Sequence, residues 1–419
     1  MKDIQNKRSD LRDSNRPSKR LLLYFELHDA PRLRAGHPGE DSQDIIDHQA
    51  TETAIQTSAH DLYEPVNDML LKAIEANSQT KIALAVSGQM LEQLSKYAPD
   101  VIEGLKRLHE TGAVEWLGLP YNYSLSVLLS EEVYREEVIR NSDLVYQYFG
   151  IRPKVLLAAP FFEKSMVHLA GAMGFEALLV MPGVWTGRSV VRDVTSEIVM
   201  IAANETLTTT ITQHFGAGNA TLTNDDFYNK VNGASDDTVV VGFSYDVFHA
   251  HREAGILRFF GKLLAQASKE GRLVHPSEAV HQYAEVLQWP ADLEADTSPW
   301  LGNEIQREAL AASRALAEAT KNRLDDKIRK YWLQLLAGDH FLHMSSSHAA
   351  LTNPYLSPYE AFTNYKDVLN SLMKSLQSAP VVEDDKTVKA VEFERQHPTT
   401  PTWAVQEQSK YQEVTRKHI

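Results

Sequence analysis

The sequence predicts an α/β fold in which a parallel sheet forms the core and a helical region follows it. Between residues 21 and 287, short apolar runs alternate with helical patterns of roughly 12–20 residues, which is the order of right-handed βαβ units. In the run TVVVGFS at 238–244, Val239, Val240, Val241 and Phe243 are hydrophobic, which fits a strand that is buried on both faces. After residue 288 the alternation stops and helical patterns follow one another.

The individual strands are predicted where apolar runs end on polar or turn residues. They cover 21–27, 81–87, 114–117, 155–159, 177–181 and 238–243, with a short strand near Leu273. Helical spacing of apolar residues predicts helices over 62–76, 91–108 with a break near Pro99, 131–149, 164–173 and 254–270. Between 197 and 215, VMIAAN and LTTTITQHF are rich in β-branched residues, so extended structure is expected there.

A second region begins near residue 288. The segment WPADLEADTSPW at 289–300 reads as a linker, and apolar stripes predict helices over 303–321, 324–336 and 358–376. We therefore expect a charged leader over 1–20, a barrel-type domain over 21–287 and a helical bundle over 288–378. The remainder, 379–419, is charged and interrupted by Pro and Thr, which predicts poor order.

Composition excludes several classes of protein. A chain of 419 residues with 43% hydrophobic residues can bury a large core, and its net charge of −14 argues against nucleic acid or an anionic membrane as partner. The absence of cysteine rules out disulfides and thiolate sites. The charged leader lacks the apolar segment of a secretory signal, and no apolar run is long enough to span a bilayer. These features predict a cytoplasmic protein.

Polar and aromatic side chains gather where the predicted strands end. In a parallel barrel these ends form the mouth in which binding sites lie. The chain contains no G-x-G-x-x-G, no P-loop and no G-x-S-x-G motif, so nucleotide binding and a serine elbow have no support. A mouth of aromatic residues and histidines with few cations suits a neutral, polyhydroxylated ligand. The candidate residues are His28, Tyr121, Tyr123, Asp246, His249 and His251, joined by Trp300, Asn303, Asp339 and His340 from the helical region.

Six segments carry a resemblance to a known family. They are FELHDAPRL at 25–33, SGQMLEQLSKYAPDVIEGLKRLHETGAVEWLG at 87–118, IRPKV at 151–155, SPWLGNEIQREA at 298–309, DHFLHM at 339–344 and YLSPYEAFTNYKDVL at 355–369. In these segments the sequence resembles glycoside hydrolase family 57, a family of α-amylases and 4-α-glucanotransferases. The resemblance implies an incomplete (β/α)7 barrel with a C-terminal helical bundle, and an α-glucan as the partner.

The resemblance also locates two catalytic positions, and neither holds a carboxylate. Retaining glycosidases need two carboxyl groups about 5–5.5 Å apart. The family's nucleophile aligns with Pro160 in VLLAAPFFE, and its acid/base aligns with Ser244 in FSYDVFHAH. Proline has no functional side chain and serine is too weak an acid. The family's GExxxHxL has become GLPYNYSL, with Leu119 for the Glu and Tyr123 for the His. The chain therefore resembles the α-amylase-like members that lack catalytic carboxylates.

Three functions remain open. The first is a catalytically impaired protein that binds maltooligosaccharide or a glycogen-like glucan. Its binding residues would be His28, Trp300, Asn303, Asp339 and His340, carried over from family motifs, and Tyr121 and Tyr123, inferred from position. The second is an active hydrolase or transferase with relocated acids, for which Asp246, two residues past Ser244 on the same side of an extended strand, is the fallback acid and Glu163 the other candidate.

The third function is a metal-dependent hydrolase that would use His249 and His251 with His28, His214 or Asp246. The first two functions need no cofactor and no metal. The sequence leaves the oligomeric state open and is compatible with a homo-oligomer.

Overall fold

The core of the molecule is one curled sheet of nine strands. The computed structural model describes residues 19–35, 44–184, 188–193, 198–215, 222–287, 293, 296–320, 326–348 and 353–378. The strand order is β8-β1-β2-β3-β4-β5-β7-β6-β9. The strands are β1 (Arg20–Leu27), β2 (Ile82–Val86), β3 (Val114–Gly118), β4 (Val155–Leu157), β5 (Ala177–Val180), β6 (Val190–Asp193), β7 (Val199–Ala202), β8 (Thr238–Ser244) and β9 (Glu285–Leu287).

The seven strands from β8 to β7 pair in parallel, whereas β6 runs antiparallel to β7. The backbone N–H of Asn204, just after β7, donates to the carbonyl of Val240 in β8 at 2.7 Å. This bond joins strands from opposite ends of the parallel series, so the sheet curls into a barrel whose closing seam is not a full ladder. The prediction of an incomplete (β/α)7 barrel is confirmed.

Helices cover the outside of the barrel because alternate residues of each strand point to opposite faces. On β1, Leu21, Leu23 and Phe25 join the apolar cluster under the helices, whereas Leu22 and Tyr24 belong to the cluster inside the barrel. The barrel helices are α2 (His48–Ser58), α3 (Glu64–Ala76), α4 (Gly88–Tyr97), α5 (Pro99–Glu110), α6 (Glu131–Phe149), α7 (Ser165–Ala172), α8 (Glu205–Thr212), α9 (Asn224–Gly233), α10 (Asp246–Ala250), α11 (Ile256–Lys269) and α12 (Pro276–Tyr283). A π-helical segment, Ala59–Tyr63, joins α2 to α3.

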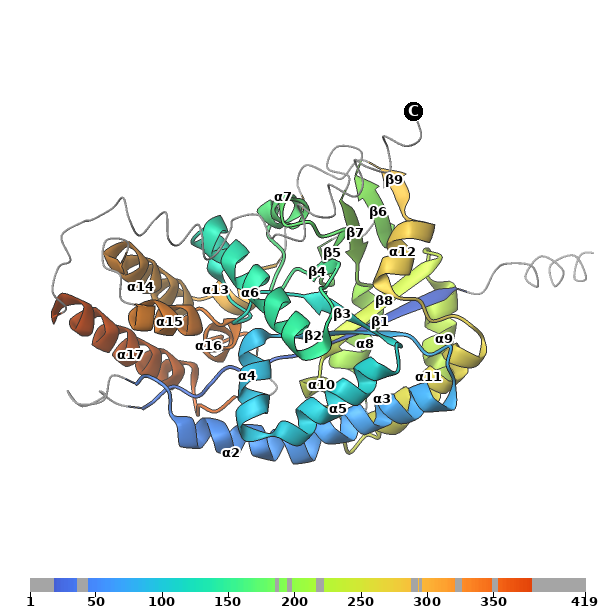
Figure 1. The fold of residues 1–419 in the computed structure, drawn as a ribbon, viewed down its shortest axis with the longest axis horizontal. Coiled ribbons are helices and arrows are strands. Elements are labelled where there is room, and N and C mark those ends of the chain that lie inside the picture. Colours follow the sequence, from blue (N-terminus) through green and yellow to red (C-terminus); the bar gives the residue numbers. More distant parts are fainter. Residues whose placement is uncertain are drawn as a thin grey trace, which may run out of the picture.

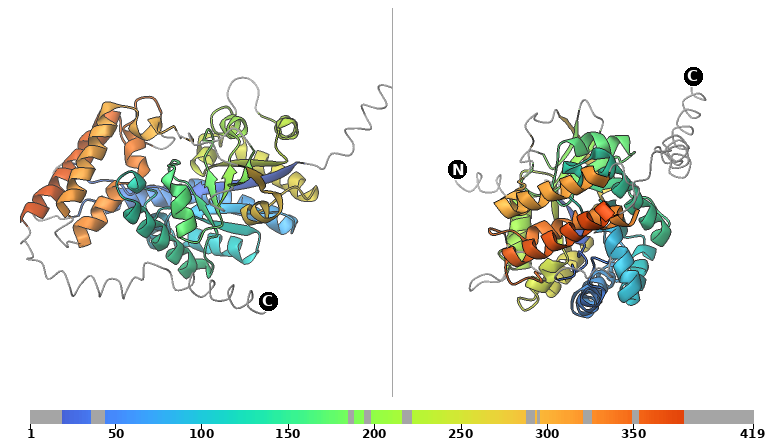
Figure 2. Two further views of the ribbon diagram at one scale, coloured as in Figure 1. Left: turned by 90° about the horizontal axis from the view of Figure 1, so that it is seen from above. Right: turned by 90° about the vertical axis from the view of Figure 1, so that its left-hand side faces the viewer.

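The C-terminal helices form a bundle on one side of the barrel (Figures 1 and 2). They are α13 (Ser298–Leu301), α14 (Glu304–Thr320), α15 (Asp326–Leu335), α16 (Gly338–His343) and α17 (Pro358–Ser378). One apolar cluster contains Trp332 and Tyr365 of the bundle together with Leu156 of β4 and Phe161, so bundle and barrel share a core. This shared core fixes the bundle beside the ends of the barrel strands.

Most predicted elements lie where the sequence indicated, and α6 begins and ends at the predicted residues. The extended structure expected over LTTTITQHF is wrong, because the segment forms α8. Asn204 starts this helix by accepting the N–H of Leu207 at 2.9 Å, and Leu207, Thr208 and Ile211 bury one face. Helix α2 was not predicted, and the strand expected near Leu273 is a single bridge to Leu21.

Several expectations fall on residues outside the described ranges. These are the leader through residue 18, the tail from residue 379 and most of the linker between 288 and 295. Within the described ranges, every helix is too short or too polar to cross a membrane.

Candidate functional site

The floor of the barrel mouth is set by the inward-facing residues of β1. Leu22, Tyr24 and Glu26 alternate along the strand toward the barrel interior, and Glu26 is only 4% exposed. Tyr24 fills the space beside Gly242 of β8, where a β-carbon would lie 2.0 Å from the Tyr24 ring. Only glycine at 242 leaves room for this ring. Glu26 therefore lies one layer above a filled barrel, at its open end.

Glu26 was missed in the sequence, although it is a buried carboxylate beside a catalytic position of the family resemblance. It pairs in register with Ser244 of β8, so both side chains face the same way. The hydroxyl of Tyr123 donates to Glu26 Oε2 at 2.6 Å. Burial raises the pKa of Glu26, while this hydrogen bond and the nearby His28 oppose the rise. The period-two spacing from Leu22 through Tyr24 to Glu26 was the signal that could have identified it.

Tyr123 is held in a fixed position by a tightly bonded loop. Its φ of 53° is the one positive φ among the described residues other than glycine, a conformation that costs about 1–3 kcal/mol when the surroundings impose it. The buried carboxylate of Glu137 accepts hydrogen bonds from the side chains of Asn122 and Ser124 on either side. The carbonyl of Tyr123 accepts the N–H of Gly338 in the bundle at 2.9 Å. The loop is thus fixed from both domains.

His28 is the residue to which the other groups of the mouth connect. Its Nδ1 lies 2.6 Å from Ser87 Oγ, which follows β2, and its Nε2 lies 2.9 Å from Asp339 Oδ2 of the bundle. The imidazole stacks on the Tyr123 ring, with centroids 4.8 Å apart and an interplanar angle of 18°. The predicted residues His28, Tyr123 and Asp339 are therefore brought together, with Glu26 beneath them.

Three aspartates surround this histidine in contrasting environments. Asp29 forms a bidentate ion pair with Arg32, in which the guanidinium nitrogens lie 2.7 and 3.1 Å from the two carboxylate oxygens. Burial, followed by the charges of Asp29 and Asp339, raises the pKa of Asp246 to about 7. Burial also disfavours the Asp339 anion, but His28 together with His343 and His340 holds its pKa well below its usual range. At neutral pH Asp339 is ionised, and Asp246 is divided between its two protonation states.

The two positions to which the family resemblance assigns the nucleophile and the acid/base also lie at the mouth. Pro160 follows β4, and a β-carbon on Gly338 would lie 3.0 Å from Pro160 Cγ and 3.2 Å from Trp300 Nε1. The Asp339 backbone therefore adjoins Pro160. Ser244 is the last residue of β8, and the chain then turns into α10 at Asp246. The expectation that Asp246 continues an extended strand on the Ser244 side is wrong, because Tyr245 is already α-helical in conformation.

Two other predicted binding residues, Tyr121 and Asn303, are engaged in packing or helix capping. Tyr121 is 3% exposed, with its ring against Gly88 and with the Arg140 guanidinium 3.7 Å from the ring centroid. A sugar could stack there only after Arg140 moved. Asn303 caps α14: it accepts the N–H of Gln306 at 2.9 Å and donates to the carbonyl of Met344 at 2.7 Å.

His340 and Trp300 lie at the junction of bundle and barrel. His340 is 3% exposed and packs near Tyr365, with ring centroids 6.2 Å apart. Burial first, and then His343, lower the pKa of His340 to about 3, so its ring is neutral. Trp300 is half-buried, with its ring 5.5 Å from Phe161, and it adjoins Pro160 through Gly338. Trp300 therefore keeps an accessible part beside the mouth, whereas His340 does not.

The remaining candidates do not converge. Glu163 accepts the N–H of Ser165 at 2.7 Å and caps the start of α7. His251 Nε2 lies 3.0 Å from the carbonyl of Thr212, while His214 and His249 are exposed. Across the described ranges, no three His, Asp or Glu side chains are grouped so that they could hold a metal ion. The grouping that the metal-hydrolase hypothesis requires is therefore not formed by these histidines.

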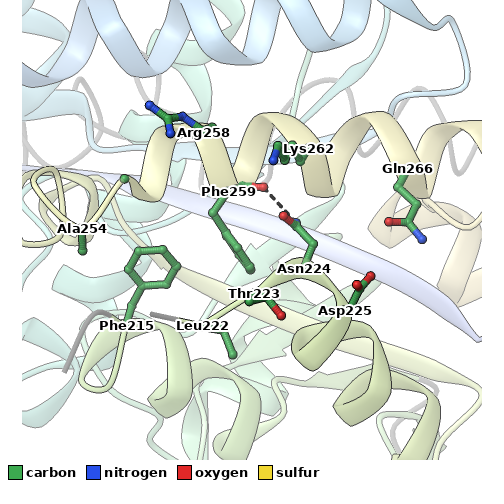
Figure 3. A pocket seen from close by; sticks show the side chains of 11 residues that line it. Phe215, Leu222, Thr223, Asn224, Asp225, Ala254, Arg258, Phe259, Lys262 and Gln266 are labelled. Atoms are coloured by element: carbon green, nitrogen blue, oxygen red, sulfur yellow. Dashed lines mark hydrogen bonds between the residues drawn. The ribbon is translucent and has the colours of Figure 1, made fainter. Parts of the chain in front are cut away.

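Two cavities bear on the position of a ligand. One, of about 830 Å³, lies beside the mouth and is lined by Asp29, Arg32 and Asp246. The other, of about 570 Å³, lies between α9 and α11 and is lined by Phe215, Asn224, Arg258 and Lys262 (Figure 3). It contains none of the predicted site residues. The first cavity is therefore the one that adjoins the candidate site.

The molecule is therefore an incomplete (β/α)7 barrel protein whose C-terminal helical bundle supplies Asp339 to the barrel mouth. The chain belongs to glycosyl hydrolase family 57, whose family model matches residues 23–288. A Methanocaldococcus jannaschii protein described as "Putative alpha-amylase" is 23% identical over 392 residues, which cover 83% of each chain.

Solved structures share the fold at low identity. A branching enzyme of Thermococcus kodakaraensis matches with a TM-score of 0.63 and 11% identity, covering 91% of this chain and 95% of that enzyme. A branching enzyme of Pyrococcus horikoshii matches with a TM-score of 0.62 and 14% identity, and the match covers 90% of this chain and 94% of that enzyme. The 4-α-glucanotransferase of Thermococcus litoralis gives 0.61 and 13%; the match covers 86% of this chain but spans only 60% of that enzyme. The proteins named here are thus described as an α-amylase, a 4-α-glucanotransferase and branching enzymes.

Proposed function

We propose that this protein binds an α-glucan at the barrel mouth but lacks the carboxylate pair with which its family cleaves glucans. The observation that carries the proposal is that the residues of the mouth are held together, while the two positions assigned to catalysis hold no carboxylate. His28, Tyr123 and Asp339 are held together, while Pro160 and Ser244 stand where the family resemblance places the nucleophile and the acid/base. The relatives named as amylase, glucanotransferase and branching enzymes support the choice of an α-glucan.

The chemistry of the mouth suits a neutral sugar. The Asp339 carboxylate accepts hydrogen bonds, the His28 imidazole can exchange partners, and Trp300 offers an aromatic surface beside Pro160. Cations are few: Arg32 is bound to Asp29, so its charge is neutralised locally. A phosphorylated ligand would meet Asp246 and Asp339 without a free cation to pair with. A cytoplasmic location stays a prediction from the sequence, which leaves the oligomeric state open.

Binding is tested by calorimetric titration with maltoheptaose. We expect heat of binding for the wild type and about 10-fold weaker binding for His28→Ala, which corresponds to about 1.4 kcal/mol. His281→Ala is the matched control, because that histidine is exposed and pairs with Glu176 on the outside. Absence of binding by the wild type would refute the proposed function.

Impaired cleavage is tested by restoring the carboxylates. The double variant Pro160→Glu with Ser244→Asp should release reducing ends from maltoheptaose on the order of 10²-fold faster than the wild type, since a positioned acid or base contributes at least that much. The pair Pro160→Gln with Ser244→Asn has the same shape without the acids and should stay inactive. Cleavage by the wild type at the rate of the restored variant would contradict the proposed impairment.

A second candidate function is slow hydrolysis by relocated acids, and one observation favours it. Asp246, with a pKa of about 7, and Asp339, with a lowered pKa, have the opposite protonation tendencies that an acid and a base need. Asp339 rather than Glu163 would be the partner of Asp246, because Glu163 caps α7. Turnover by the wild type that is lost in Asp246→Asn would establish this function, and an unchanged rate would remove it.

A further inference from the structure

A cavity next to the mouth has no role in the proposed function as described so far. It has a volume of about 830 Å³, within the range of about 300–1,000 Å³ for small-molecule sites. The barrel supplies one wall through the loop after β1 and through α2, and the bundle supplies the other through the start of α17. Asp29, which directly follows His28, lies in its lining, so the cavity adjoins the mouth.

Two polar groups in this cavity have no hydrogen bond or ion pair with any described residue. One is the Asp246 carboxyl, which is half-buried at the start of α10. The other is the hydroxyl of Tyr355, whose ring packs edge-on against His343 with centroids 5.7 Å apart. Such groups are available to a ligand without loss of an internal bond.

The charged groups of the lining determine which ligands can enter. The Arg32 cation is bound by the Asp29 carboxylate at 2.7 and 3.1 Å. Asp47 accepts the N–H of Ala50 at 2.9 Å, and Glu360 accepts the N–H of Leu356 at 2.8 Å, so the wall contains two further acidic side chains. The cavity therefore carries an excess of negative charge, which repels phosphate and carboxylate ligands.

The rest of the lining combines apolar side chains, such as Leu33 and Leu62, with several hydroxyl and amide groups. Helix α2 presents Thr53, Thr57 and Ser58 on the turns that face the cavity, and α17 adds Asn364. Hydroxyl and amide groups can both donate and accept, as sugar hydroxyls do. Tyr355 contributes the flat aromatic surface on which a sugar ring can stack. The lining thus matches a neutral polyhydroxylated chain.

We propose that this cavity is a second arm of the binding site, which holds the continuation of a neutral glucan chain whose first part occupies the mouth. The proposal rests on the proposed function, because the chain reaches the arm through the mouth. It adds a preference for long over short oligosaccharides and a discrimination against phosphorylated sugars.

The test compares maltotriose with maltoheptaose by calorimetric titration of the full-length protein. The wild type should bind maltoheptaose about 10-fold more tightly than maltotriose, a difference of about 1.4 kcal/mol. Tyr355→Ala should remove most of this difference, whereas Tyr355→Phe should keep the part that comes from stacking. Tyr359→Ala is the control, since Tyr359 is 71% exposed and lies outside the lining. Glucose 6-phosphate should compete no better than glucose.

A second pair of variants guards against misfolding of Tyr355→Ala. Thr57→Arg places a long side chain into the cavity from an exposed helical position, and Gln56→Arg makes the same change one residue away, outside the lining. Only Thr57→Arg should weaken maltoheptaose binding. Equal affinity for both sugars, unaffected by Tyr355→Ala and Thr57→Arg, would overturn the arm while leaving the proposed function intact. No binding of either sugar would refute the proposed function, and the arm with it.

Discussion

The buried carboxylate of Glu26 makes Tyr123→Phe an informative perturbation. The substitution keeps the ring that stacks on His28 and removes only the hydroxyl that donates to Glu26 at 2.6 Å. A hydrogen bond to a charged group contributes about 1.5–3 kcal/mol, against about 1 kcal/mol for a neutral pair. Because Glu26 is 4% exposed, water cannot easily replace the lost donor. We expect the free energy of unfolding to fall by about 2 kcal/mol at a pH above the folded pKa of Glu26, where its carboxylate is ionised.

The pH dependence of this loss identifies its cause. Burial raises the pKa of Glu26 above its ordinary value of 4.5, so the stability it contributes is fully present below 4.5 and is lost as the pH rises through the folded pKa. Removal of the Tyr123 hydroxyl raises this pKa further. The variant should therefore lose about 2 kcal/mol where Glu26 is ionised in both proteins but only about 1 kcal/mol where Glu26 is protonated in both.

The assay is urea unfolding, followed by fluorescence, at an acidic pH and at a pH above the folded pKa of Glu26. Tyr245→Phe is the matched control, because its buried hydroxyl donates to the neutral Asn67 Oδ1 at 2.9 Å. The control should lose about 1 kcal/mol at every pH. If Tyr123→Phe and Tyr245→Phe show the same loss at both pH values, Glu26 is not an ionised partner of Tyr123 and the reasoning fails.

Three further predictions concern separate features. Asn303→Ala removes the α14 cap, so it should lower the free energy of unfolding by about 1–2 kcal/mol, and with it the melting temperature, while glucan affinity stays unchanged. Weaker glucan binding by a variant of full stability would instead indicate that Asn303 contacts the glucan. Gly242→Ala places a β-carbon 2.0 Å from the Tyr24 ring and should cost about 3 kcal/mol or prevent folding; a stable variant would contradict the packing inside the barrel. Glucan affinity should change between pH 6 and 8 as Asp246, with its pKa of about 7, loses its proton, and titration of Asp246→Asn should show no such step; an identical step in that variant would assign it to another group.

The fold could be predicted from the sequence because its strands are buried on both faces. A strand such as β8 must be apolar throughout, and it therefore contrasts strongly with the polar turn that follows. Helix α8 was not predicted because its threonines favour strands by intrinsic preference, while the cap at Asn204 and the burial of Leu207 and Ile211 determine the structure. Local preference was overridden there by capping and by packing.

The site was harder to predict because chemistry and packing use the same residue types. Glu26 lies in the apolar run LLLYFEL, where a single carboxylate does not disturb the strand pattern. Asp339 and His28 were each predicted as candidates, but their contact was not, since the two lie 311 positions apart in the sequence and give no local signal of contact. Tyr121 and Asn303 show the converse: each lies near a strand or helix end, yet one packs under Arg140 and the other caps α14.

The loop that carries Tyr123 shows why loss of the catalytic carboxylates need not abolish binding. An isolated buried carboxylate such as Glu137 would cost several kcal/mol, and only its donors, which include Asn122 and Ser124, make it tolerable. These donors belong to the loop itself. If the loop changed shape, the buried carboxyl of Glu137 would lose its hydrogen-bond donors. The bond from Gly338 to the Tyr123 carbonyl adds the bundle to the same constraint. A ligand therefore meets a mouth that is already ordered, and its binding energy is not spent on ordering the loop. Neither Pro160 nor Ser244 takes part in these hydrogen bonds, so under the proposed function the residues at these two positions can differ from the family's carboxylates while the mouth stays ordered.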